Sequence, residues 1–99
     1  MTYSDQLALR KMRFDDIVYD DDYLVIWREV SVGRILKQSG IPMGNPAWFW
    51  GINFDARPQT MDMRGMCRDL DECKVAFRAA WERYRPQITE ADYERAKRR

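Results

Sequence analysis

The chain has 99 residues, of which 45% are hydrophobic and 33% are charged. These values are those of a globular chain, so we expect one domain with a single core and no wholly disordered chain. The 17 basic and 16 acidic residues leave a net charge of only +1, so the overall charge does not attract nucleic acid or an anionic membrane.

The sequence gives no sign of a membrane span or an export signal. No run of about 18 apolar residues is present to form a transmembrane helix. The first 14 residues carry several charges in place of the apolar stretch of a secretory signal. We therefore expect a cytoplasmic protein without membrane contact, in which Cys67 and Cys73 are both reduced.

The N-terminal 14 residues give the weakest structural signal. Ser4 is a suitable cap for a short helix over residues 5–11, but Leu7 and Leu9 are too few to form an apolar helical stripe. Disorder is the alternative for this segment. We accordingly expect residues 1–14 to be either disordered or a short helix.

Three segments in the first half of the chain are typical of strands. Residues 15–22 combine five aspartates, which disfavour a strand, with an Ile-Val-Tyr run, which favours a short one. Residues 23–27 are an apolar run too short for a buried helix, and residues 32–37 predict another strand. The connection at residues 28–31 lacks the Asn-Gly or Asp-Gly of a strong hairpin turn, so the register stays open.

Residues 47–54 predict the strongest strand. The two-residue period of a strand separates its side chains into one large apolar face and one smaller face. The large face would carry Trp48, Trp50, Ile52 and Phe54. Phe49 is the one large side chain on the smaller face, and residues 61–67 are a possible fourth strand.

A helix after Asp69 is the clearest element of the chain. Asp69 is a good N-cap, with Glu72 three residues later in the position of a capping box. An apolar stripe follows at spacings of three and four. It consists of Cys73, Ala76, Phe77, Ala80, Trp81 and Tyr84. Pro86 ends this helix and Thr89 caps a second one, so residues 86–99 form a C-terminal helical extension.

These elements predict an α+β fold. We expect a three- to four-stranded antiparallel meander, with the amphipathic helix packed on one face and a short trailing helix. The single domain would span residues 15–85. Phe77 and Trp81 should pack on the sheet face that carries Trp50, because a helix settles where it buries the most apolar area.

Three motifs resemble those of a group of short alphaproteobacterial proteins. The motifs are Val32-Gly33-Arg34-Ile35 in a hairpin, Trp48-Phe49-Trp50 in a strand, and a helical A-x-x-x-F-x-x-x-W pattern ending in Phe77 and Trp81. Cys73 takes the place of the usual alanine, and the usual Asp-Gly of the hairpin turn is missing. The resemblance covers roughly residues 22–85 and implies the same fold. No activity is assigned to the group, so it implies no function.

The residue types that carry catalysis are scarce. Without histidine, the chain has no Ser-His-Asp or Cys-His nucleophile and no histidine ligand for a metal. Cys67 and Cys73 alone cannot close a zinc site, and the aspartates of residues 15–22 lack the order of a calcium-binding loop. We therefore predict a protein that is not an enzyme, with no catalytic residue, no cofactor and no metal site.

Two functions remain open from the sequence. The preferred one is a non-enzymatic protein-interaction or regulatory module, which binds a protein partner or a second copy of itself. The alternative is a nucleic-acid-binding module that uses an aromatic and basic sheet face. The candidate surface contacts are Phe49, Arg34, Lys37, Arg57 and Arg64.

Overall fold

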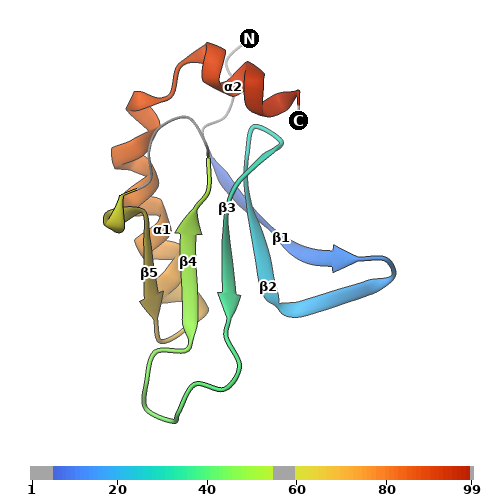
Figure 1. Ribbon diagram of the computed structural model, residues 1–99, viewed down its shortest axis with the longest axis vertical. Coiled ribbons are helices and arrows are strands. Elements are labelled where there is room, and N and C mark those ends of the chain that lie inside the picture. The colour runs from blue at the N-terminus through green and yellow to red at the C-terminus, as the bar shows by residue number, and fades with distance from the viewer. Residues whose placement is uncertain (1–5, 55–59, 99) are drawn as a thin grey trace.

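The fold is an antiparallel sheet covered on one face by a helix (Figure 1). The computed structural model describes residues 6–54 and 60–98. Its elements are β1 (Leu7–Phe14), β2 (Ile17–Trp27), β3 (Val30–Lys37), β4 (Trp48–Ile52), the 3-10 turn η1 (Met61–Met63), β5 (Arg64–Cys67), α1 (Leu70–Tyr84), the 3-10 turn η2 (Arg85–Gln87) and α2 (Glu90–Lys97). The strands follow in sequence order, with β1 and β5 at the edges. The predicted α+β class is confirmed, with five strands where three to four were expected.

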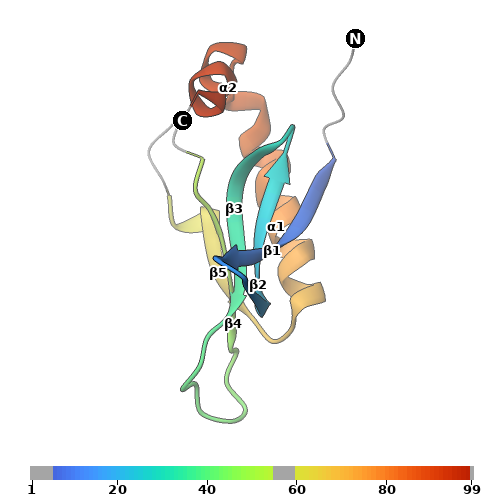
Figure 2. The same ribbon diagram turned by 90° about the vertical axis from the view of Figure 1, so that its right-hand side faces the viewer.

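The core lies between the sheet and α1, which packs across β3, β4 and β5 (Figures 1 and 2). The predicted helix stripe is buried there, apart from the partly exposed Ala76. The ring centroids of Phe77 and Trp50 are 6.1 Å apart. Trp81 lies with its ring centroid 5.4 Å from that of Trp27 and 6.4 Å from that of Phe54. The predicted packing of Phe77 and Trp81 on this sheet face is confirmed.

Gly33 of β3 permits the closest approach of α1 to the sheet. A Cβ atom at this position would lie 2.3 Å from the Phe77 ring and 2.5 Å from the carbonyl oxygen of Gly51. Phe77 in turn packs edge to face against Trp50. Each of the three sequence motifs therefore supplies one residue to a single contact in the core, which gives the motifs a structural role.

Both predicted helix caps are present. The backbone N–H of Glu72 donates to Asp69 Oδ1 at 2.8 Å. At the start of α2, the N–H of Asp92 donates to the Thr89 hydroxyl at 3.1 Å and the N–H of Thr89 donates to Asp92 Oδ2 at 2.9 Å. These bonds satisfy backbone donors that the first helical turn leaves without partners.

The β2–β3 connection is a two-residue turn, which the sequence left open. Arg28 and Glu29 occupy it at φ values of 48° and 69°, where a residue other than glycine costs roughly 1–2 kcal/mol. The C-terminal helix holds this turn. The Arg28 guanidinium lies 4.6 Å from the Trp27 ring centroid and 3.0 Å from Glu90, and the Tyr93 hydroxyl donates to the Arg28 carbonyl at 2.9 Å. Tertiary contacts therefore fix the register.

The N-terminal segment is a strand, so the prediction of disorder or a short helix is wrong for the part of it that the structure describes. β1 pairs with β2 from Leu7↔Trp27 to Phe14↔Ile17. The spacing of two between Leu7 and Leu9 is too short for a helical stripe but places both side chains on one face of a strand. The sheet thus begins before residue 15, the expected start of the domain; residues 1–5 lie outside the described part.

The outer part of the β1–β2 hairpin turns away from the rest of the sheet (Figures 1 and 2). Between the pairs Lys11↔Tyr23 and Arg13↔Val18, one residue of β1 faces four of β2, which makes a wide bulge. A bulge of this kind bends a hairpin and increases its twist. We name residues 13–19 the arm; residues 13–18 lie beyond the bulge, and Tyr19 is the first of the four β2 residues within it.

Candidate interaction surface

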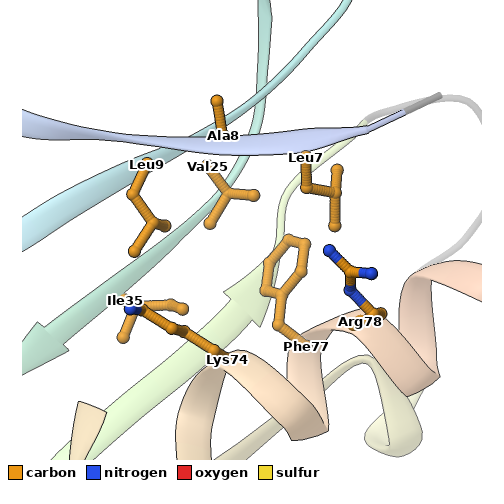
Figure 3. A pocket seen from close by; sticks show the side chains of 8 residues that line it. All are labelled: Leu7, Ala8, Leu9, Val25, Ile35, Lys74, Phe77 and Arg78. Carbon is orange, nitrogen blue, oxygen red and sulfur yellow. The ribbon is translucent and has the colours of Figure 1, made fainter. Parts of the chain in front are cut away.

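A groove lies between edge strand β1 and helix α1, with a volume of about 330 Å³ (Figure 3). It exists because α1 covers β3 to β5 and leaves the helix side of β1 and β2 partly open. Its apolar lining consists of Leu7, Leu9, Val25, Ile35 and Phe77. Leu7 and Leu9 point from β1 toward α1, whereas Ala8 points the other way, as the alternation of a strand requires.

Two cations of α1 stand on either side of Phe77 at the rim of this groove. Lys74 and Arg78 are four residues apart, so they lie one turn apart on the same helix face. The Lys74 amino group is 3.7 Å from Asp71, in an exposed pair that contributes little. Arg78 forms no ion pair with any residue that the structure describes. The groove is therefore apolar inside and positively charged at its rim.

The strand that forms one wall of the groove has a free edge. β1 pairs only with β2, so its outer backbone groups have no neighbouring strand within the described residues. Arg10, Lys11 and Arg13 of this strand are all exposed. Charged side chains on an edge discourage pairing with a like-charged strand, and this edge therefore favours an acidic neighbour.

The arm carries four large apolar side chains in contact with solvent. Phe14 is 68% exposed, Ile17 58%, Tyr19 44% and Val18 42%. Two carboxylates, those of Asp15 and Asp16, stand at the turn between Phe14 and Ile17. Phe14 and Ile17 pair across the hairpin and so share one face, and an exposed apolar pair next to carboxylates is typical of a protein contact site.

Three of the five predicted surface contacts share the sheet face opposite α1. Arg34 pairs with Gly51, which pairs with Arg64, so the two arginines lie in one row across β3, β4 and β5. The half-buried Phe49 ring lies over Gly51, where an added Cβ would lie 3.1 Å from two ring carbons. The row therefore presents an aromatic ring between two arginines.

Asp22 neutralises one end of this row. Arg34 donates to Asp22 Oδ1 from Nε at 2.8 Å, and a second N–H donates to the other carboxylate oxygen. These hydrogen bonds raise the pKa of Arg34. Lys37 lies on the opposite, helix-covered face because it pairs with Trp48, and Arg57 lies outside the described residues. The five candidates therefore do not form one site.

Cys67 and Cys73 are buried free thiols in the core. Burial raises the pKa of Cys73, and the neighbouring Cys67 thiol raises it further. A thiol of raised pKa stays protonated at neutral pH and is a poor nucleophile.

Among the described residues, no three cysteine or carboxylate side chains gather as ligands for a metal ion. None of the helices in this part of the chain is long and apolar enough to cross a membrane.

Sequence reasoning missed both the groove and the arm. The local signals were the spacing of Leu7 and Leu9, which is compatible with a strand but too short to predict one, and the apolar residues between the aspartates of residues 15–22. Compared with protein-family models, curated proteins and solved structures, the chain matches none. Arguments about function therefore rest on the geometry of this chain.

Proposed function

We propose that the chain is a non-enzymatic protein-interaction module, which binds an apolar, acidic segment of a protein in the groove between β1 and α1. The observation that carries this proposal is the apolar groove of about 330 Å³ beside a free, basic strand edge, with Lys74 and Arg78 at its rim. An enzyme would need a cluster of reactive groups, and the groove offers two cations and aliphatic or aromatic carbon.

Each part of the groove supports one part of the interaction. The lining favours an aromatic or aliphatic anchor, because anchors buried in apolar pockets supply most of the binding free energy of an interface. The cations favour carboxylates next to that anchor and discriminate against basic segments. The open edge of β1 can add main-chain hydrogen bonds to an extended segment.

A selection from a random peptide library tests this proposal directly. The immobilised protein should enrich peptides with an aromatic or aliphatic residue flanked by aspartate or glutamate. Their binding should weaken about tenfold or more when Lys74 and Arg78 are both replaced by glutamate. Enrichment of no peptide, or of peptides whose affinity is the same for both proteins, contradicts the proposal.

A matched control separates the groove from overall charge. Lys37→Glu together with Arg68→Glu makes the same change in net charge, at two exposed positions that do not line the groove. Selected peptides should bind this control as they bind the parent protein. Equal loss in both variants attributes binding to the net charge of the protein and contradicts a groove site.

Binding of single-stranded nucleic acid on the open sheet face is a second candidate function. It is supported by the Phe49 ring between Arg34 and Arg64, since bases stack on aromatic rings flanked by cations. The Asp22 carboxylate on Arg34 counts against it. Binding of an oligonucleotide that weakens with salt and is lost in Phe49→Ala supports this candidate, and no binding at low salt excludes it.

We also propose a cytoplasmic location and kinship with the short alphaproteobacterial proteins. The location is supported by the two free thiols, because disulfides are rare in that compartment. The kinship is supported by the three motifs that meet around Phe77.

A further inference from the structure

We infer that the segment that fills the groove is the arm of a second copy of this chain, so that two chains associate reciprocally, each arm in the groove of the other. This inference rests on the proposed function and names its partner. It starts from the observation that one chain carries both an unoccupied apolar groove and an exposed apolar arm.

The arm and the groove are complementary in both polarity and charge. The arm presents Phe14 and Ile17 around the carboxylates of Asp15 and Asp16. The groove presents the partly exposed side chains of Leu7 and Leu9 beside the cations of Lys74 and Arg78, over a floor of buried apolar side chains. Seating the arm would cover the apolar side chains of both surfaces and place two carboxylates beside two cations, one of which, that of Arg78, has no ion pair with any described residue.

The shape of the hairpin favours contact between two chains over contact within one. The arm turns away from α1 (Figures 1 and 2), and α1 forms one wall of the groove of its own chain. Five residues separate Leu9 in the groove from Phe14 on the arm, a strand length of about 17 Å. When two chains are related by a two-fold axis beside β1, the arm of each chain lies in the groove of the other. The two contacts are equivalent, so the assembly is complete with two chains.

Pairing of two β1 edges is a less favourable way to associate. An antiparallel pair of β1 strands would bring Arg10, Lys11 and Arg13 of one chain next to the same three cations of the other. Like charges on neighbouring strands are destabilising. The arm avoids this repulsion if the carboxylates of Asp15 and Asp16 at its turn meet the rim formed by Lys74 and Arg78, while Arg13 at its base lies outside the groove.

Light scattering during size-exclusion chromatography tests the inference with charge-reversed variants. The arm variant is Asp15→Asn with Asp16→Lys, in which asparagine is used because Asp15 has a φ of 54°. The groove variant is Lys74→Glu with Arg78→Glu. The parent protein should reach twice the monomer mass as its concentration rises. Each variant alone should need a concentration about tenfold or more higher to reach the same mass.

Mixing the two variants gives the most specific result. In the mixed pair, the basic arm of one chain meets the acidic groove of the other, and the acidic arm of the second chain meets the basic groove of the first. Both contacts are therefore complementary, and an equimolar mixture should recover the doubled mass that neither variant reaches alone. The control Lys37→Glu with Arg68→Glu should associate like the parent and should not rescue the arm variant.

The remaining outcomes separate this inference from the proposed function. A parent protein that stays monomeric at every concentration, yet binds the selected acidic peptides in its groove, contradicts the inference and leaves the proposed function standing. A doubled mass that persists in both variants places the contact elsewhere and also contradicts it. Masses that grow beyond two chains contradict the closed, reciprocal pair.

Discussion

Phe77 and Phe14 are the same residue type in opposite surroundings. Phe77 lies in the body, formed by β3, β4, β5 and α1, where it is only 1% exposed and packs on Gly33 and Trp50. Phe14 lies on the arm, where it is 68% exposed. Burial of an aromatic ring stabilises the body within one chain, whereas the same gain for the arm requires a second molecule.

The difference follows from how each region is held. The body is held by side chains from α1 and its three strands, which meet in one core together with Val25 and Trp27 of β2 and Tyr93 of α2. The arm pairs through Arg13↔Val18 and Phe14↔Ile17 beyond a bulge. An isolated two-stranded hairpin is at best marginally stable, so the arm contributes little to folding and remains free to serve in binding.

Trp81→Ala should give the largest loss of stability. Trp81 is buried against Trp27 and Phe54, and removal of such a ring costs about 3–5 kcal/mol of unfolding free energy. Phe14→Ala removes a ring from the arm and should change this free energy by less than about 0.5 kcal/mol in dilute protein. Urea denaturation followed by circular dichroism measures both. Equal losses would show that the arm is part of the core.

Gly33→Ala should cost about 3 kcal/mol, near the upper end of overpacking effects. Its new methyl group would meet both the Phe77 ring and the carbonyl of Gly51, neither of which can move without disturbing the core. The matched change on the open face is Gly51→Ala, which meets the partly exposed Phe49 ring and, at ordinary contact distance, the Arg64 Cβ, and should cost less than about 1 kcal/mol. Equal shifts of the denaturation midpoint in Gly33→Ala and Gly51→Ala would contradict the close packing of α1 on Gly33.

Asp69→Ala should cost about 1 kcal/mol, because it removes the acceptor for the Glu72 backbone N–H at the start of α1. Asp69→Asn keeps a side-chain acceptor and should recover most of this loss. Thermal or chemical denaturation distinguishes the two. An unchanged midpoint in Asp69→Ala would mean that α1 does not depend on this cap.

Alkaline pH should weaken the body through Cys73. Burial raises the pKa of this thiol in the folded chain, while an exposed thiol in the unfolded chain has a pKa of about 8.5. Above that pH the unfolded chain releases the proton and the folded chain keeps it, so stability falls as pH rises, by about 1.4 kcal/mol per pH unit at most. Cys73→Ala should show a shallower decline between pH 8 and pH 10, roughly the range in which the unfolded thiol ionises. An equal decline of stability with pH in the parent and in Cys73→Ala would contradict this role of the Cys73 thiol.

The body could be predicted from the sequence because its signals are local and redundant. The cap at Asp69, the stripe through Phe77 and the alternation at Trp50 each indicate the same packing, and all are present. The β1 strand could not be predicted, because Leu7 and Leu9 offer only two apolar positions and the strand depends on its pairing with β2.

The candidate surface was predicted only in part, for a related reason. Sequence reasoning placed Phe49 opposite the core, because alternation along a strand assigns faces. Its place between Arg34 and Arg64 follows from the pairing of β3, β4 and β5. The groove depends on where α1 ends across the sheet, and the ion pair of Arg34 with Asp22 depends on strand register. Neither the position of α1 on the sheet nor the strand register can be read from the local pattern of apolar and charged residues.

Amide hydrogen exchange at low and high protein concentration tests the central claim most directly, because it reports each region separately. If the arm of one chain lies in the groove of the other, exchange at residues 13–19 and along β1 should slow as concentration rises, while β4 and β5 stay unchanged. Exchange in the arm that is equally fast at every concentration, or slowing confined to the open face around Phe49, would contradict the account.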